Sequence, residues 1–213
     1  MPRTRLTPQR QSQIRRTNIG RIIVFCEGKT EEFYFQYFAE IIKKNKFTNI
    51  EIVLEDAGGN AQAVLNFANS FLSTEENMRK YSNFGMYLAF DCDSPDGIES
   101  VIHSANDYEL LVSNSLFETW LLMHFEDVEV KQSKRDTYRR LTYHLNSLYK
   151  KGHKGKTREI IQNGDVLKAL DNAKRLEAKY ISEGKTMSLK IKSMNPYTSV
   201  FRLIEQFILE MSV

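Results

Sequence analysis

Apolar residues in this chain form short unbroken runs, separated by stretches in which they recur at helical spacing. Ile22–Cys26 and Met86–Phe90 are runs of the first kind, and Ile50–Leu54 and Tyr108–Val112 are two further strand candidates. Such runs, rich in β-branched and other apolar side chains, are typical of strands buried on both faces of a parallel sheet. We therefore predict four strands.

The stretches between these runs predict helices. After Thr30, apolar pairs recur at Phe33/Tyr34, Tyr37/Phe38 and Ile41/Ile42, and Asn60 is a suitable cap for a helix that buries Ala61, Val64, Leu65, Ala68 and Phe71. Glu31 and Glu32 fall in the first turn of the earlier helix, where carboxylates suit the helix dipole. Alternating strands and helices predict an α/β fold, with a mainly parallel four-stranded sheet flanked by helices.

Beyond residue 113 the pattern predicts helices alone. They are Asn114–Phe125, a helix marked by Tyr138, Leu141, Leu145 and Leu148, then Val166–Ile181, and a final helix opened by Asn195-Pro196. Lys150–Arg158 contains five basic residues and no acid, which predicts an exposed basic loop. We divide the chain into a flexible basic arm (1–20), an α/β catalytic domain (21–125) and an α-helical C-terminal extension packed on it (126–213).

The composition predicts a folded cytoplasmic protein. A chain of 213 residues with 41% hydrophobic residues has enough apolar surface for one folded domain, with or without an extension. It contains no apolar stretch of about 18 residues and no secretory leader, so we expect a cytoplasmic protein with no membrane partner. Cys26 and Cys92 are too few for a disulfide framework or a structural zinc site.

The net charge of +3 is unevenly distributed. Residues 1–21 contain no acid and six arginines, namely Arg3, Arg5, Arg10, Arg15, Arg16 and Arg21. This arm is either a solvated leader or a segment that contacts phosphates.

Acidic residues stand where two predicted strands end. Glu27 follows the first strand, and Asp91 and Asp93 follow the third. The carboxyl ends of parallel strands share one edge of a sheet, and an Asp-x-Asp pair in extended backbone projects to one side. Such clustered carboxylates repel unless a cation neutralises them, and Mg²⁺ prefers oxygen ligands. We predict a Mg²⁺ or Mn²⁺ site; the alternative is that these aspartates only form a turn.

Two motifs carry a resemblance to a known family. Val24-Phe25-Cys26-Glu27-Gly28-Lys29-Thr30-Glu31, followed by Leu88-Ala89-Phe90-Asp91-Cys92-Asp93, resembles the Toprim domain of topoisomerases, primases and overcoming-lysogenization-defect nucleases. With Asn114–Leu122 and Asn195-Pro196, the chain is more specifically similar to the RloB family. The resemblance implies a Toprim-like sheet, acid/base or metal-linked work for Glu27, and Mg²⁺ binding by Asp91 and Asp93. It also implies a place in prokaryotic antiphage defence, beside an ATPase partner of the AAA or ABC type.

Glu118 has two interpretations. Ser115-Leu116-Phe117-Glu118 fits a capping box, which favours a structural role. Its place in the family pattern implies an additional metal ligand. His124 lies on an apolar helix, where a histidine satisfied within the core is more common than a catalyst.

Contact with a polyanion must come from basic residues. The candidates for nucleic-acid binding are Lys29, Lys150, Lys151, Lys154, Lys156 and Arg158. A solvated surface is the alternative for each, and such contacts do not distinguish DNA from RNA.

Three functions follow from these observations. We expect a Mg²⁺-dependent nuclease with Glu27, Asp91 and Asp93 as catalytic residues. A haloacid-dehalogenase-like phosphatase with Asp91 as nucleophile is the enzymatic alternative, because Phe90-Asp91-Cys92-Asp93 also resembles that motif. The third is a non-catalytic nucleic-acid-binding or regulatory subunit of an ATPase complex. A homodimer is one option for assembly, and the sequence leaves the oligomeric state open.

Overall fold

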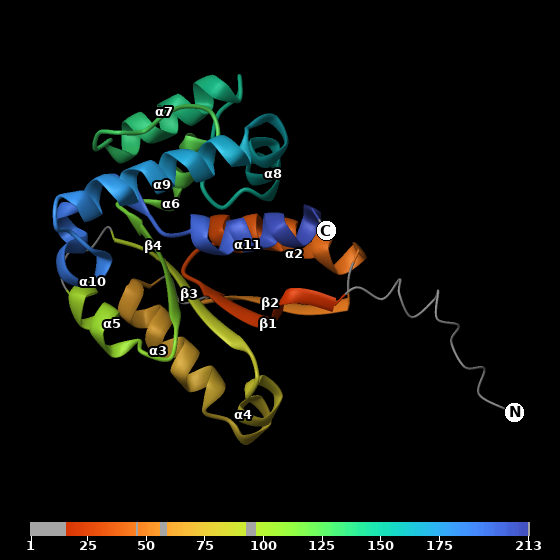
Figure 1. The fold of residues 1–213 in the computed structure, drawn as a ribbon. Coiled ribbons are helices and arrows are strands. Elements are labelled where there is room, and N and C mark those ends of the chain that lie inside the picture. The colour runs from red at the N-terminus through yellow and green to blue at the C-terminus, as the bar shows by residue number, and fades with distance from the viewer. Residues whose placement is uncertain (1–15, 46, 56–58, 93–96, 213) are drawn as a thin grey trace, which may run out of the picture.

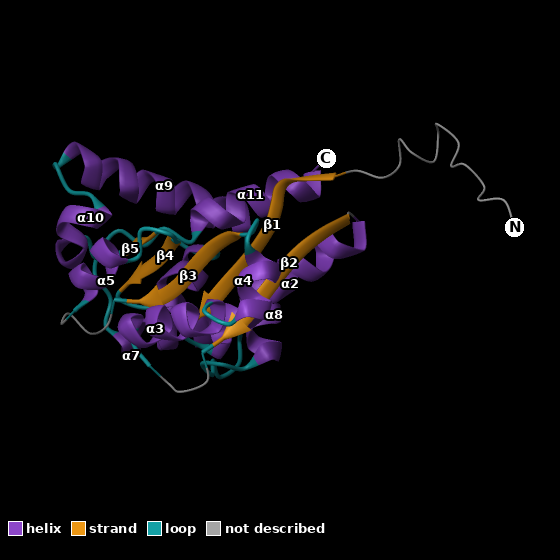
Figure 2. Cartoon of the chain, turned by 90° about the horizontal axis from the view of Figure 1, so that it is seen from below, coloured by secondary structure: helices purple, strands orange, loops and turns teal. Residues whose placement is uncertain are grey.

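The computed structural model describes residues 16–45, 47–55, 59–92 and 97–212 (Figure 1). At its centre is a five-stranded sheet with the order β2-β1-β3-β4-β5, which Figure 2 shows side by side. The strands are β1 (Arg16–Cys26), β2 (Phe47–Leu54), β3 (Gly85–Asp91), β4 (Glu109–Asn114) and β5 (Tyr197–Thr198).

The sheet is mostly parallel. β1 pairs in parallel with β2 and β3, and β3 pairs in parallel with β4. The α/β class, the helices around the sheet and its mainly parallel character are therefore as predicted. The predicted number of four strands is wrong, because β5 adds a fifth strand antiparallel to β4. A strand of two residues is too short to show a period, so the sequence gives no signal for it.

Helices cover both faces of the sheet. In Figure 1, α3 and α5 lie below the sheet, while α2 and α11 lie above it, beneath α6, α7, α8 and α9. The helices in the first part of the chain are α2 (Lys29–Asn45), α3 (Ala61–Leu72), α4 (Glu75–Tyr81) and α5 (Ile98–Ser104). Those in the second part are α6 (Phe117–Met123), α7 (Lys134–His144), α8 (Lys154–Asn163), α9 (Val166–Ser182), α10 (Met187–Lys190), the 3₁₀ turn η1 (Ile191–Ser193) and α11 (Phe201–Ser212).

Local sequence explains where α3 begins. The side chain of Asn60 accepts a hydrogen bond from the amide of Ala63 at 3.1 Å, as expected of an N-cap. The buried face of α3 consists of Ala61, Val64, Leu65 and Ala68.

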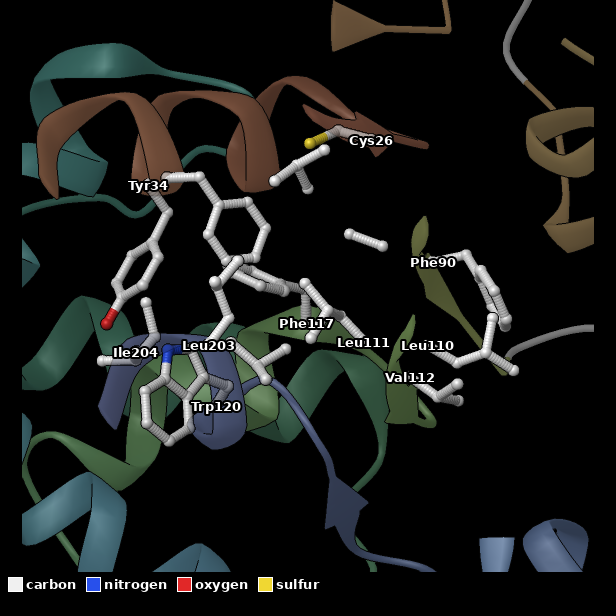
Figure 3. Packing of buried hydrophobic residues seen from close by; sticks show 14 of the residues in the cluster. Cys26, Tyr34, Phe90, Leu110, Leu111, Val112, Phe117, Trp120, Leu203 and Ile204 are labelled. Atoms are coloured by element: carbon white, nitrogen blue, oxygen red, sulfur yellow. The ribbon is translucent and has the colours of Figure 1, made fainter. Parts of the chain in front are cut away.

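Aromatic side chains join the helices above the sheet into one core. Tyr34 of α2 packs edge-on against Phe117 and Trp120 of α6, with ring centroids 5.5 and 6.2 Å apart. Figure 3 shows these rings beside Leu203 and Ile204 of α11, which are also fully buried. This packing fixes the start of α6 over the carboxyl ends of the central strands.

Several predicted element boundaries are wrong. β1 begins at Arg16, so residues 16–20 of the predicted flexible arm are strand, while residues 1–15 lie outside the described part of the chain. Asn114 ends β4 instead of opening a helix, and α6 begins only at Phe117. The predicted basic loop is helical from Lys154 onward, because His153 caps α8 by accepting from the amide of Lys156.

The segment at Asn195-Pro196 returns to the sheet edge before the last helix begins. The side-chain amide of Asn195 donates to Asn114 Oδ1 at 3.1 Å. The side-chain amide of Asn114 donates to the backbone carbonyls of Ile191 and Met194 at 2.7 Å each. These bonds place β5 beside β4, so the final helix begins at Phe201 and not at Pro196. None of the helices in the described ranges is long and apolar enough to span a membrane.

Candidate active site

The strand order reverses between β1 and β3, and we call the space beyond the carboxyl ends of these two strands the crevice. The chain passes from β1 to β2 on one side, then crosses back to β3 on the other side of β1. In an open α/β sheet, ligands bind at such a reversal, beyond the carboxyl ends of the strands. Glu27 directly follows β1, and Asp91 is the last residue of β3.

Glu27 and Asp91 meet at this crevice. Glu27 Oε2 accepts a hydrogen bond from the backbone amide of Asp91 at 2.9 Å, and the amide of Glu27 donates to the carbonyl of Ala89 at 3.0 Å. Asp91 is buried, whereas Glu27 is partly exposed. The contact between these two residues follows from the parallel pairing of β1 with β3.

Both oxygens of Asp91 have partners. Oδ1 accepts from the amide of Phe117 at 2.7 Å, and Oδ2 lies 3.3 Å from the Lys151 ammonium. Burial, together with the charge of Glu31, nevertheless raises the pKa of Asp91 well above its ordinary value. Burial is the larger of these two causes, and the Lys151 ammonium offsets only part of the rise in pKa.

Glu31 is the first additional carboxylate of the site. It is 1% exposed, and burial followed by the charge of Glu118 raises its pKa from 4.5 to about 7. Its Oε2 is buried and has no hydrogen-bond partner within the part of the chain that the structure describes. A Cβ atom on Gly28 would stand 2.6 Å from this oxygen, so glycine allows the Glu31 carboxylate to lie against the chain after β1.

Glu118 is the second additional carboxylate of the site. The capping box predicted for Ser115 and Glu118 is wrong. Leu116, not Ser115, is the N-cap of α6, so no N-cap side chain bonds this helix; its first amide, that of Phe117, donates to Asp91 instead. Glu118 is 0% exposed, and its Oε1 accepts from the Tyr149 hydroxyl at 2.9 Å. Its Oε2 is buried, and none of the described residues is its hydrogen-bond partner. The side chain therefore points into the acidic cluster. We use this name for Glu27, Glu31, Asp91 and Glu118.

The segment between α7 and α8 contributes the remaining polar groups. Tyr149 donates to Glu118, Lys151 pairs with Asp91, and the amide of Gly152 donates to Thr30 Oγ1 at 2.8 Å. Burial, with the nearby Glu118, raises the pKa of Tyr149 far above its ordinary value, so its hydroxyl keeps its proton. Burial and the same carboxylate raise the pKa of Tyr138, whose hydroxyl is buried and has no hydrogen-bond partner among the residues described.

Lys151 connects the acidic cluster with the surface. Although burial lowers the pKa of Lys151, the charges of Asp91, Glu118 and Glu31 raise it above its ordinary value. The Lys151 side chain is 37% exposed, against 2% for that of Asp91. Its stem therefore lies at the opening of the cluster, with the ammonium directed inward.

The other predicted nucleic-acid-binding residues divide into two groups. Lys29, Lys150, Lys154 and Arg158 are exposed. Lys29 lies beside the α7–α8 segment, because a Cβ atom on Gly152 would stand 3.4 Å from its Cβ. Lys156, in contrast, is engaged with Glu159 at 2.7 Å and with the Ser147 hydroxyl.

The donor set suits a hard divalent cation in its chemistry. Three buried carboxylates act on Lys151, and two of their oxygens have no hydrogen-bond partner among the described residues. Carboxylate oxygens are the ligands that Mg²⁺ prefers. As the side chains stand, however, no three His, Cys, Asp or Glu residues among those described form a ready-made metal site. Asp93, the remaining predicted ligand, lies outside the described residues.

Comparison with known proteins gives one match. The family model of RloB-like proteins matches residues 22–207, which is most of the chain. The chain belongs to the RloB-like protein family. No curated protein and no solved structure matches it.

The matched range of this RloB-like protein includes both halves of the candidate site. It contains the acidic cluster and the α7–α8 segment with Tyr149 and Lys151.

Glu31, Tyr138 and Tyr149 are not among the site residues that the sequence predicts. A signal for Glu31 existed, because it lies four and seven positions before Phe35 and Phe38, on the apolar stripe of α2. No local pattern indicates that Tyr149 and Tyr138 reach the cluster. The expectation for His124 is confirmed: it is a core residue whose ring is hydrogen-bonded to the Tyr34 hydroxyl and the Trp120 carbonyl. Cys26 and Cys92 are buried free cysteines.

Proposed function

We propose that this RloB-like protein is a divalent-cation-dependent nuclease on a Toprim-like sheet. The observation that carries the proposal is the acidic cluster at the crevice between β1 and β3, with unpartnered oxygens on Glu31 and Glu118. Removing several carboxylates from water is costly unless a cation or protons neutralise them. The nuclease role and a place in antiphage defence rest further on the resemblance to Toprim nucleases and RloB-like effectors.

The residues proposed to hold Mg²⁺ or Mn²⁺ are Asp91, Asp93 and Glu118, with Glu27 beside them. Glu31 joins this set because its buried Oε2 has no partner. Bound there, the cation would lower the pKa of a water molecule and neutralise charge on the phosphoryl oxygens.

The chain's own residues supply the other parts of phosphodiester hydrolysis. Glu27 is partly exposed and can accept a proton from the attacking water. Lys151 has further N–H donors besides the one directed at Asp91, and these can stabilise charge that develops on the phosphate.

Exposed lysines at the opening of the cluster support a polyanionic substrate. Lys29 and Lys150 flank the place where the amide of Gly152 is bonded to Thr30, and Lys154 lies over the Phe33 ring at 5.9 Å. Such contacts bind a sugar-phosphate backbone without reading its bases. The proposed substrate is therefore DNA or RNA.

The test is cleavage by purified protein, alone and with an ATPase partner. Plasmid, single-stranded DNA and total RNA are incubated with Mn²⁺ and wild type, Glu27→Ala or Asp91→Asn. We expect cleavage by wild type, its loss in both variants and its loss on chelation. Asp107→Asn is the matched control and should keep full activity. Asp107 is exposed and precedes the amino end of β4, away from the carboxyl ends of the strands where the site lies.

Two results would contradict the nuclease proposal. One is cleavage that Asp91→Asn leaves unchanged. The other is a Mn²⁺-loaded wild type that cuts none of these substrates, with or without the ATPase partner. An acid-labile phosphoenzyme on Asp91 would instead indicate a phosphatase.

A further inference from the structure

The α7–α8 segment forms hydrogen bonds with three separate parts of the α/β core. Tyr149 reaches Glu118 in α6, Lys151 reaches Asp91 at the end of β3, and Gly152 reaches Thr30 in α2. These bonds bring residues from the C-terminal half of the chain into the acidic cluster.

Tyr149 is held more firmly than a surface side chain. It is 4% exposed, and its backbone amide donates to Thr142 Oγ1 at 3.0 Å. Its ring packs edge-on against Tyr138, with centroids 5.2 Å apart and an interplanar angle of 72°. Backbone and ring are thus both fixed, so the hydroxyl has a defined place.

The two oxygens of Glu118 are in different situations. Oε1 accepts a hydrogen bond from the Tyr149 hydroxyl at 2.9 Å, whereas Oε2 is buried and has no partner in the described ranges of the chain. A carboxylate with one oxygen bonded to a fixed donor cannot rotate freely about its last bond. The other oxygen is therefore held in one direction, inside the cluster.

We propose that Tyr149 is a positioning residue, which holds Glu118 by Oε1 so that Oε2 is kept for the divalent cation. This inference rests on the proposed function and adds to it a residue that touches no reacting atom. Hydrogen-bond donors behind a ligating carboxylate orient it, and their loss typically weakens metal binding by about 10- to 100-fold.

The direct test is Mn²⁺ binding by Tyr149→Phe, which removes the hydroxyl and keeps the ring. Mn²⁺ affinity is measured from the rise in melting temperature across a Mn²⁺ titration, because a ligand that binds only the folded state stabilises it. We expect binding about 10- to 100-fold weaker than in wild type. Tyr143→Phe is the matched control: Tyr143 lies in α7, is 77% exposed, and its change should leave Mn²⁺ affinity as it is.

A double-mutant cycle separates positioning from a general structural role. If Tyr149 acts through Glu118, then Tyr149→Phe should weaken Mn²⁺ binding in wild type but not in a Glu118→Gln background. Equal weakening in both backgrounds would overturn the proposal. Thr142→Val removes only the acceptor of the Tyr149 amide and should weaken binding in the same direction, by a smaller factor; this variant keeps the test decisive should Tyr149→Phe not fold.

The outcomes distinguish this inference from the proposed function. If wild type binds no Mn²⁺, or if Asp91→Asn leaves binding unchanged, the metal site itself is wrong. If wild type binds Mn²⁺, Asp91→Asn abolishes binding, and neither Tyr149→Phe nor Thr142→Val weakens it, only the role of Tyr149 is wrong.

Discussion

The carboxylate of Glu27 accepts a hydrogen bond from the backbone amide of Asp91 at 2.9 Å, across 64 positions of sequence. The bond joins the ends of two neighbouring parallel strands at the point where the strand order reverses. Because the two strands are paired in the sheet, this bond fixes how far apart Glu27 and Asp91 lie in the proposed active site.

Replacing Gly152 should weaken Mn²⁺ binding as well as lower the free energy of unfolding. Gly152 and Gly184 both have φ of +69°, where a side chain is strained. Gly152→Ala and Gly184→Ala should therefore each lower the free energy of unfolding by about 1 kcal/mol. Only Gly152→Ala should also weaken Mn²⁺ binding, because Gly152 follows Lys151 and is bonded to Thr30. Urea unfolding and a Mn²⁺ titration of both variants measure this; equal Mn²⁺ affinities would contradict it.

Glu31 should make the metal-free protein less stable as pH rises. Burial and the charge of Glu118 raise the pKa of Glu31 from 4.5 to about 7 in the folded state. The folded protein then binds more protons than the unfolded chain, so this contribution is fully present below pH 4.5 and lost as pH rises through 7. Urea unfolding with chelator between pH 4.5 and 7.5 should show a less negative slope for Glu31→Gln than for wild type. Identical slopes would show that Glu31 does not titrate in this range.

Much of the site could be predicted from the sequence because it depends on where strands end. Glu27 and Asp91 follow apolar runs, and parallel pairing brings them together. The role of Glu118 was obscured because Ser-x-x-Glu is also a capping pattern, and only the extension of β4 to Asn114 shows that the helix begins later. Tyr149 and Lys151 reach the cluster through tertiary packing of α7 and α8, which leaves no periodic signal. β5 was missed because it is only two residues long.

His124 should have the opposite effect on stability to Glu31. Burial lowers the pKa of His124 from 6.5 to about 4, and its ring is bonded to the Tyr34 hydroxyl and the Trp120 carbonyl. The unfolded chain then binds the extra proton, so this contribution is present above pH 6.5 and lost as pH falls through 4. The loss should approach about 3 kcal/mol. His124→Gln should flatten the rise in unfolding free energy between pH 4 and 6.5, and an unchanged rise would contradict the assignment.

The central claim is that the acidic cluster binds a divalent cation, and anomalous scattering from crystals grown with Mn²⁺ tests it most directly. We expect a manganese peak in contact with Asp91 and with Glu31 or Glu118, and the Lys151 ammonium moved away from Asp91. Crystals from saturating Mn²⁺ that show no peak at this crevice, with Lys151 still paired to Asp91, would contradict the account.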